Sequence, residues 1–514
     1  MPKLPHRAVL CLLLLITSII FSGCKRAQPA PDMVTVLIES SPNNLDLRIG
    51  VDAQSEHIGC LIFDSLLRKD EHFNLQPWLA ESWQQPDPLT YIFHLRSGVR
   101  FHNGKPLTSA DVAWTLDSLR NGSLISPRAG NFVSLERMET PDASTVILHL
   151  THADNALLWN LANGNIGIVP AGSGRDLGLH PIGTGPFKFV SQVQDNEVLL
   201  TRNEDSWQPA AHIRSLRFAV VPDAITRALE LQKGSADAAI NALTADTVYS
   251  LRNNRDLVIE TGPGTVLNYI NFNVRDSLLA DKRVRQAIAL GIDRSAIITA
   301  LFRGNARAAN SLLPIGHWAW TDSGTQYPFD PAAARALLDA AGYKPHAADG
   351  IRLRLTMKTS TDETTRLLAA ILQQQLRVIG IQLDLRSYEF GTFYGDISRG
   401  AFQMYALRWI GSNEDPDIFR YAYASSSIPP KGANRGFYSN PVLDRLLADA
   451  AVETDQNIRR SDYVQAQKIL ADDLPGINLW YLDNVIVHTR RLGNIRLQPS
   501  GGYDFLRQAT VTSR

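Results

Sequence analysis

The residues from 351 to 387 carry the clearest periodic pattern of the chain, two alternating segments on either side of an amphipathic one. Apolar and polar side chains alternate in the outer segments, which is typical of β-strands. The apolar members are Ile351, Leu353, Leu355, Met357, Ile381, Leu383 and Leu385. Between Glu363 and Ile379 the apolar residues share one helical face, and Gly380 predicts the end of that helix. A strand, a helix and a second strand in this order indicate an α/β fold.

Other segments predict the same mixture of helices and strands. Residues 91–95 alternate as a strand does. An apolar face over 331–341 has proline at its first position and glycine just past its end, which predicts a capped helix. We expect a further helix over 281–293, packed on a core, and a strand over 266–272. No internal repeat interrupts this pattern.

Two clusters of glycine and proline are candidate boundaries between domains. They lie at residues 181–186 and 261–264, and each breaks regular structure. The second cluster comes just before the strand predicted at 266–272, where it can act as a hinge that absorbs a change in backbone angles. A plain surface loop explains the same composition equally well, so the pattern leaves both interpretations open.

The size and charge of the chain narrow the class of protein. A chain of 514 residues with 44% apolar residues can bury large cores and favours several lobes. Lysine plus arginine and aspartate plus glutamate each number 51. This balance provides no net positive field for a polyanion, so we expect no nucleic-acid partner.

The first 24 residues have the features of an export signal. Lys3 and Arg7 precede an apolar run from Ala8 to Phe21 that is too short to span a bilayer. The small residues before Cys24 resemble a lipobox, although Phe21 stands where leucine is usual. We therefore expect residues 1–23 to be removed, Cys24 to be acylated, and the protein to be anchored by lipid in the periplasm or cell envelope. An ordinary signal peptide with an incidental cysteine is the alternative.

The segment after the predicted anchor is expected to be a tether, and the remaining cysteine is expected to be a packing residue. Residues 24–32 are rich in alanine and proline, a composition that predicts a flexible tether. Cys11 leaves with the signal, so Cys60 alone stays in the folded body. Its apolar surroundings in sequence predict that Cys60 is a small packing residue.

Several motifs together resemble one family, the extracytoplasmic solute-binding proteins of family 5, which includes dipeptide-, oligopeptide- and nickel-binding proteins of ABC importers. The similarity covers nearly the whole mature chain. The densest match runs from Leu79 to Val112 and includes Tyr-Ile-Phe-His-Leu-Arg-Ser-Gly-Val-Arg-Phe-His-Asn-Gly-Lys-Pro-Leu-Thr. Further matches follow in the order of the family at 183–187, 281–287, 337–343 and 415–417.

The resemblance implies a bilobal clamp of the class II type, like other periplasmic binding proteins, with an extra domain inserted in the first lobe. Lobe I would comprise residues 33–68, 182–261 and 485–514, with the insert at 69–181, and lobe II would comprise 262–484. The chain would cross between the lobes near 262–268 and 479–486 and form a hinge. A ligand would then be enclosed between lobes that close on it.

The resemblance also implies ligand contacts in the segment from Trp409 to Asp417. Trp409 would cover an apolar wall of the site. Peptide-binding relatives place an aspartate, which pairs with the ligand's amino group, where this chain has Ser412. A neutral hydroxyl does not offset a buried ammonium group, so recognition of a free amino terminus is in question unless Glu414 or Asp415 compensates. A turn capped by Asp415 and its neighbours is the structural alternative.

The resemblance implies further ligand contacts, each taken from the matching position in relatives. Arg366 lies where a dipeptide-binding relative has an arginine that serves the ligand carboxylate. Arg408 and Arg435 are further candidates for that group, although a single arginine is more often solvated. The loop Gly50-Val51-Asp52 and Tyr269 fall where relatives contact the ligand backbone.

The sequence gives little support to an enzyme or a metal protein. It has no Gly-x-Ser-x-Gly, His-Glu-x-x-His or paired Cys-x-x-Cys motif. Its turn at 98–105 resembles a phosphate loop only faintly. Histidines such as His317 are isolated, so we expect no metal site and no cofactor. We expect a monomer that binds a peptide-like solute and hands it to ABC permease subunits. A nickel or metal-chelate carrier, a lipoprotein without a transport role and an exported hydrolase stay as alternatives.

Overall fold

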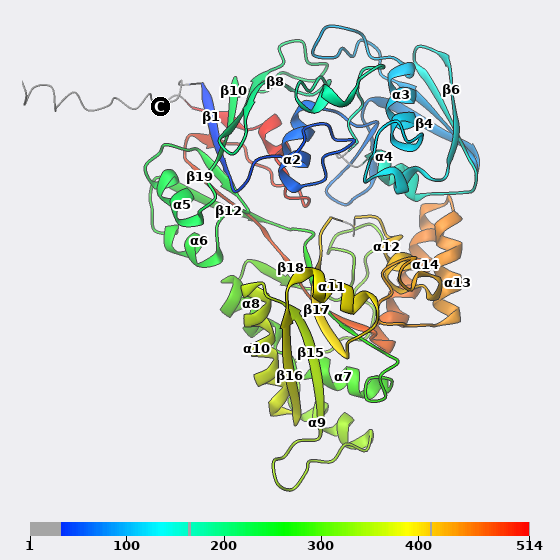
Figure 1. The fold of residues 1–514 in the computed structure, drawn as a ribbon, viewed down its shortest axis with the longest axis vertical. Helices are drawn as coiled ribbons and strands as arrows, with labels where there is room; N and C mark the ends of the chain where they lie inside the picture. Colours follow the sequence, from blue (N-terminus) through cyan, green and yellow to red (C-terminus); the bar gives the residue numbers. More distant parts are fainter. Residues whose placement is uncertain (1–31, 163–165, 412–413, 513–514) are drawn as a thin grey trace, which may run out of the picture.

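The chain folds into two lobes that are connected by two extended segments (Figure 1). The computed structural model describes residues 32–162, 166–411 and 414–512. The predicted lipidation site Cys24 and the predicted ligand contact Ser412 therefore lie outside the described residues. Helices and strands are mixed in both lobes, which confirms the predicted α/β class. In the described residues, no helix combines the length and the apolar composition that a membrane crossing requires.

The first lobe is built on a seven-stranded sheet whose strands come from three separate parts of the chain. In spatial order they are β12 (Leu257–Gly262), β19 (Asn484–Thr489), β11 (Ala238–Ile240), β1 (Met33–Ile38), β10 (Ser215–Val220), β9 (Glu197–Arg202) and β8 (Phe187–Val193). Strand β1 is central and buried on both faces. Val36 packs with helix α2 (Ala53–Ile62), whereas Leu37 packs on the opposite face with α5 (Ala224–Gln232) and α6 (Ala245–Leu251).

A second, antiparallel sheet forms a separate unit between α2 and β8 in the sequence. Its strands are β4 (Ala80–Asp87), β5 (Thr90–Leu95), β7 (Thr145–Leu150) and β6 (Leu135–Asp142). Helices α3 (Ser109–Arg120) and α4 (Ala156–Ala162) contribute to its own core. The hairpin of β2 (Leu67–Lys69) and β3 (Leu75–Pro77) precedes it. The strand predicted at 91–95 is confirmed as β5, and its buried residues alternate as the sequence does.

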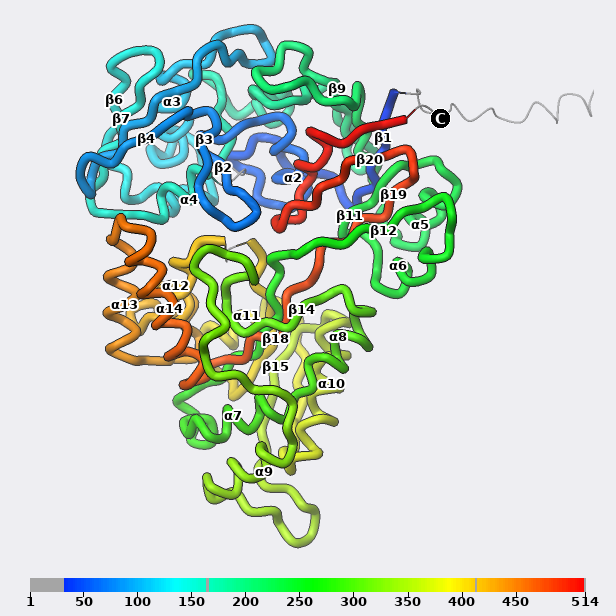
Figure 2. The backbone as a smooth tube through the Cα atoms, turned by 180° about the vertical axis from the view of Figure 1, so that it is seen from behind, coloured from blue at the N-terminus to red at the C-terminus, as the bar shows by residue number. Residues whose placement is uncertain are grey.

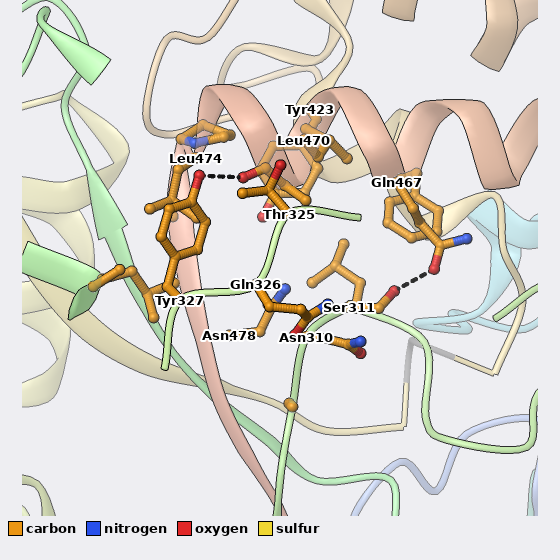
Figure 3. A pocket seen from close by; sticks show the side chains of 18 of the residues that line it. Asn310, Ser311, Thr325, Gln326, Tyr327, Tyr423, Gln467, Leu470, Leu474 and Asn478 are labelled. Atoms are coloured by element: carbon orange, nitrogen blue, oxygen red, sulfur yellow. Dashed lines mark hydrogen bonds between the residues drawn. The ribbon is translucent and has the colours of Figure 1, made fainter. Parts of the chain in front are cut away.

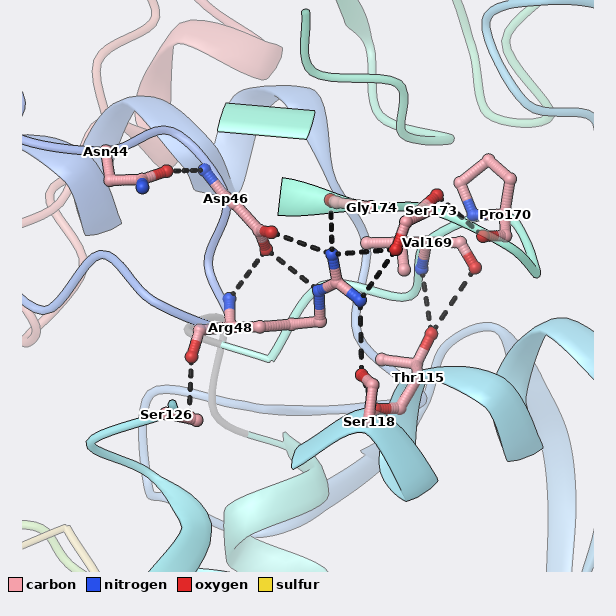
Figure 4. Close-up of polar contacts among 10 residues, drawn as sticks. All are labelled: Asn44, Asp46, Arg48, Thr115, Ser118, Ser126, Val169, Pro170, Ser173 and Gly174. Atoms are coloured by element: carbon pink, nitrogen blue, oxygen red, sulfur yellow. Dashed lines mark hydrogen bonds and ion pairs between the residues drawn. The ribbon is translucent and has the colours of Figure 1, made fainter. Parts of the chain in front are cut away.

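A buried ion pair connects this insert to the first lobe (Figure 4). Arg48 and Asp46 are almost inaccessible to solvent, and the Nη2 atom of Arg48 lies 2.8 Å from the Oδ2 atom of Asp46. The Nη1 atom of Arg48 also donates to the Oγ atom of Ser118 in α3 at 3.1 Å. Charged groups are buried at little net cost only when their hydrogen bonds are satisfied. The guanidinium group therefore holds the insert in a defined position on the lobe.

The second lobe contains a six-stranded sheet with helices on both faces. The strands are, in order, β14 (Ala306–Ala308), β18 (Gly476–Leu482), β13 (Leu267–Phe272), β17 (Met404–Trp409), β15 (Leu353–Ser360) and β16 (Ile381–Tyr388). Helices α7 (Lys282–Leu290), α8 (Arg294–Phe302), α9 (Pro331–Ala340) and α10 (Glu363–Val378) share the main core on one face. Helix α11 (Phe390–Ser398) packs against the other face. Three more helices, α12 (Ile418–Tyr423), α13 (Pro441–Val452) and α14 (Gln456–Asp473), surround a third cluster.

Most elements predicted in this lobe are confirmed. Strands β15 and β16 pair in parallel with α10 between them, which is the predicted unit. Helix α9 begins with proline and is capped by Asp330. The helix predicted over 281–293 was too long, because α7 ends at Leu290 and Asp293 caps the next helix instead.

Two chain segments cross between the lobes side by side, as the view from behind shows (Figure 2). Strands β12 and β19 are neighbours in the first sheet, and their continuations β13 and β18 are neighbours in the second. The Nδ2 atom of Asn484 donates to the carbonyl of Pro263 at 3.0 Å and so joins the two crossings. The lobe limits predicted from the sequence, and the role of these crossings as a hinge, stay proposals.

The insert and the second lobe also touch each other directly. The Nζ atom of Lys69 pairs with a carboxylate oxygen of Glu414. The rings of Phe73 and His317 stack with centroids 5.2 Å apart. The Nδ2 atom of Asn155 donates to the carbonyl of Glu453 at 2.6 Å. An ion pair, a ring stack and a hydrogen bond therefore fix the position of the second lobe relative to the insert in this structure.

Candidate functional site

The face of the second sheet that is turned away from the main core carries two of the predicted ligand contacts. Tyr269 of β13 stacks on Trp409 at the end of β17, with ring centroids 5.7 Å apart and 18° between the planes. Tyr269 also contacts the edge of the Tyr405 ring at 6.0 Å. Burial is the largest cause that raises the pKa of Tyr269 well above its ordinary value, so its phenol is neutral at physiological pH.

Three aromatic residues that the sequence analysis missed extend this group toward solvent. Phe390 and Tyr394 come from α11 and stack on each other with centroids 5.8 Å apart. Tyr421 comes from α12, and its ring lies 6.3 Å from that of Trp409. The exposed fractions are 54% for Phe390, 46% for Tyr421 and 39% for Tyr394. We call this group of Tyr269, Phe390, Tyr394, Tyr405, Trp409 and Tyr421 the aromatic surface.

A patch of large, exposed aromatic rings is typical of a binding surface and is uncommon elsewhere on the surface of a soluble protein. The sequence did contain one signal for them. Phe390 and Tyr394 are four residues apart, the spacing of neighbours on one helical face. Without the sheet to show which face is exposed, that spacing is also what a buried helix has.

Arg435 lies against the aromatic surface and is buried, with 6% of its surface exposed. Its Nη2 atom donates to the hydroxyl of Tyr394 at 2.6 Å, and its guanidinium carbon lies 5.0 Å from the centre of that ring. Within the described ranges of the chain, no carboxylate lies within ion-pair distance of Arg435. A buried cation in an aromatic environment is therefore part of the site.

Arg366 and Arg408 lie near the same end of the lobe and are both exposed. Arg366 is in the first turn of α10, and Arg408 is next to Trp409 in β17. Their charges reach Asp362, whose pKa is held below its ordinary value against partial burial, chiefly by hydrogen bonds from Thr365 and further by both arginines. Neither arginine has a carboxylate within 4.0 Å among the described residues. Both are therefore available to an anionic ligand.

Asp415 lies in a different environment from the one expected of an exposed ligand contact. It is half-buried, and burial followed by the charge of Asp417 raises the pKa of its carboxyl group to about 6. Asp417 itself pairs with Arg420 at 2.5 Å. Arg459 and Asp154 also act electrostatically on Asp415, and Asp154 belongs to the insert. The structure thus places Asp415 beside the contact between the lobes, and its role as a ligand contact stays a prediction.

The predicted loop of the first lobe is held rigidly. Asp52 caps α2 by accepting from the backbone N–H of Ser55 at 3.0 Å. The Nη2 atom of Arg128 donates to the carbonyl of Gly50 at 3.0 Å. A side chain at Gly50 would meet the carbonyl oxygen of Asn44 at 2.1 Å, so the loop requires glycine there. Val51 remains half-exposed between these anchors and can contact a ligand.

An internal pocket of the second lobe is not suited to a peptide (Figure 3). Its volume is about 50 Å³, which is room for one or two water molecules. Polar side chains line it, and the hydroxyl of Ser311 donates to Gln467 at 2.7 Å. The hydroxyl of Tyr327 donates to the carbonyl of Ala471 at 2.9 Å. These bonds are internal to the second lobe, and the volume is too small for a peptide.

The described residues contain no cluster of three histidine, cysteine or acidic side chains that could hold a metal ion. His317 has a local partner instead. His317 is buried, its Nε2 atom lies 3.1 Å from the carbonyl of Glu414, and burial lowers its pKa to about 3. Cys60 lies in α2, and burial raises the pKa of its thiol to about 12.

Comparisons with known proteins give a consistent result. A sequence model of the bacterial extracellular solute-binding proteins, family 5 Middle, matches residues 74–430. The chain is 31% identical over 431 residues to di/tripeptide-binding protein 1 of Pseudomonas aeruginosa, covering 78% of this chain and 79% of that protein. It is 28% identical over 517 residues to the glutathione-binding protein GsiB of Shigella dysenteriae, covering 98% and 99%.

Among solved structures, NikZ from Campylobacter jejuni in complex with Ni(L-His) superposes with a TM-score of 0.74 at 26% identity. The match covers 94% of this chain and 100% of that one. The described fold is therefore shared with this solved structure over nearly its whole length.

Proposed function

Because the chain belongs to family 5 of the bacterial extracellular solute-binding proteins, we propose that it captures a peptide or peptide-like organic solute and delivers it to an ABC permease. The observation that carries the proposal is similarity over 78% of this chain to a di/tripeptide-binding protein. Family membership also means that the chain is a transport binding protein and not an enzyme. The solute is therefore released chemically unchanged.

The chemistry of the second lobe supports a peptide-like ligand. A peptide offers apolar side chains, which the aromatic surface can cover, and a carboxylate, which Arg435, Arg366 or Arg408 can bind. The rigid loop at Val51 faces the ligand from the first lobe in this proposal. Closure of the two lobes removes the ligand from water and strengthens each of these polar contacts.

The opposite end of a peptide ligand is an amino group. Glu414 is engaged by Lys69, so Asp415 is the remaining acidic candidate for an ammonium group in this segment. Its raised pKa makes it a poor counter-ion below about pH 6 while the site is empty, but an arriving cation lowers that pKa again. We therefore keep Ser412 and Asp415 as candidate contacts for the amino end.

We further propose that the mature protein is held at the membrane by a lipid on Cys24. The motif before Cys24 supports this. Metabolic labelling with a radioactive fatty acid tests it in cells that express the full chain. We expect label in the native chain and none in Cys24→Ser, and equal labelling of the two would contradict the proposal.

Isothermal titration calorimetry of the chain from residue 25 onward tests the ligand class. The panel contains dipeptides, tripeptides, glutathione and a nickel–histidine chelate. We expect dissociation constants of about 1 μM or below for at least one peptide-like member. Binding of the nickel chelate alone would instead assign the chain to metal transport.

A further inference from the structure

Arg435 differs from the other arginines that are buried in the described residues. Arg48 and Arg128 pair with the carboxylates of Asp46 and Glu56. Arg227 and Arg285 each donate to several backbone carbonyls. Arg459 donates to the carbonyl of Ala450 and lies among aromatic rings.

Arg435 has neither a carboxylate nor a carbonyl partner in the described residues. It interacts instead with the phenol groups of Tyr394 and Tyr405. A guanidinium group has five N–H donors in a planar fork, and phenols that contact it from the side leave most of them unused.

Burial lowers the pKa of Arg435, and the tyrosines around it raise the pKa by more, but no carboxylate of the described residues pairs with this charge. A buried charge that lacks a counter-ion keeps part of the cost of losing its hydration. Tyr394 orients the guanidinium group, and its ring is partly exposed, so a ligand on the aromatic surface can reach Arg435. The group that matches a planar fork of donors is a carboxylate, which accepts two parallel hydrogen bonds.

We propose that Arg435 binds the carboxylate of the ligand, and that the cargo is therefore a short peptide or peptide-like acid with a free carboxylate. The inference rests on the proposed function and makes it more specific. Arg366, which the family resemblance indicated for this role, is exposed, and its positive charge already acts on the carboxylate of Asp362. A solvated arginine of that kind contributes little to selectivity, because water competes for its donors.

The test compares a peptide acid with its C-terminal amide by isothermal titration calorimetry. We expect the native protein to bind the acid ~100-fold more tightly than the amide. In Arg435→Gln the acid should bind only a few-fold more tightly than the amide. This change should come from weaker binding of the acid, while the affinity for the amide stays the same. Arg435→Lys should keep an intermediate preference, since it retains the charge without the fork. The matched control is Arg354→Gln, an exposed arginine of β15 that pairs with Asp349, and it should bind as the native protein does.

Thermal unfolding of the ligand-free variants separates a ligand anchor from a structural arginine. Arg435→Gln removes an uncompensated buried charge, so its Tm should equal or exceed that of the native protein. A fall in Tm of several degrees would overturn the inference even if binding is lost.

Failure of this inference can be distinguished from failure of the proposed function. If the native protein binds acid and amide equally, or if Arg366→Gln and not Arg435→Gln removes the preference, the inference fails and the proposed function stands. If the native protein binds neither form of any peptide, both fail together.

Discussion

The guanidinium carbon of Arg459 lies 5.0 Å from the centre of the Trp159 ring, across the contact between the second lobe and the insert. The same group lies 5.5 Å from the ring of Trp318 and 5.8 Å from that of Tyr463. Arg459 is buried, and cation–π contacts are strongest when they are desolvated. The two lobes are thus joined by a charged group that also acts on the buried carboxyl of Asp415.

The pH dependence of stability follows from that carboxyl group. Its pKa is raised from 3.8 to about 6 in the folded state, so the folded state binds the proton more tightly. Stability from this group is therefore greatest below about pH 4 and is lost as the pH rises through about 6. Asp415→Asn stays neutral, so at pH 7 and without ligand its free energy of unfolding should exceed that of the native protein by at least ~1 kcal/mol.

Urea unfolding of both proteins from pH 4 to pH 8 checks this prediction. The difference between them should grow from pH 4 to about pH 6 and then stay constant. The groups that face Asp415 are Asp417, Arg459 and Asp154, and the comparison leaves all three unchanged. A difference that does not vary with pH would contradict the predicted titration.

Trp409 is expected to contribute most of the apolar contact with the ligand. Replacing it with alanine removes the ring that Tyr269 and Tyr421 pack against. We expect Trp409→Ala to weaken ligand binding by about 1–3 kcal/mol, measured by calorimetry, while Trp409→Phe loses less. Trp114→Ala is the matched control, because Trp114 is a half-exposed tryptophan of the insert. Equal losses in the two alanine variants would show that Trp409 has no special role.

Asn484 holds the two interlobe crossings together. Its Nδ2 atom donates to the carbonyls of Pro263 and Gln498, each at 3.0 Å, and its Oδ1 atom accepts from the Nδ2 atom of Asn241 at 2.9 Å. We expect Asn484→Ala to lower the free energy of unfolding by about 1–3 kcal/mol, because these part-buried carbonyls lose their donor.

The same substitution should loosen the relative position of the lobes. Small-angle scattering of the ligand-free protein should then give a larger radius of gyration for Asn484→Ala than for the native chain. A variant that is less stable but has an unchanged radius of gyration would show that Asn484 stabilises the fold without controlling the crossings.

The buried pair of Arg48 and Asp46 gives a prediction about the insert. Arg48→Met leaves Asp46 charged and buried without its partner. We expect a loss of about 3–5 kcal/mol in the free energy of unfolding. Replacing both residues, as Arg48→Met with Asp46→Leu, should recover most of that loss. If the double variant is no more stable than the single one, the pair acts through its bonds to Ser118 and the loop and not through charge compensation.

The elements that were predictable from sequence are those with local signals. Strand β15, helix α10 and strand β16 each bury one regular face, and Gly380 ends the helix with a positive φ of 87°. Local signals also misled in one place. Ile292 continued the helical period after Leu290, but it belongs to the turn before α8, which Asp293 begins.

The aromatic surface was only partly predictable, for a physical reason. Trp409 and Tyr269 were found because they lie in motifs shared with relatives. Phe390 and Tyr394 come from α11 and Tyr421 comes from α12, and only the pairing of β13 with β17 brings Tyr269 next to Trp409, which Tyr421 contacts. Burial of Arg435 likewise depends on those rings, so its sequence neighbours did not reveal that it lacks a counter-ion.

The most direct test of the account is the chemical identity of the solute that the protein carries from its own compartment. The protein is purified from the envelope without added ligand and denatured, and the released small molecules are identified by mass spectrometry. The account predicts intact peptides or peptide-like acids with a free carboxylate, in about equimolar amount. Recovery of a nickel chelate in their place, or of solutes without any carboxylate, would contradict it.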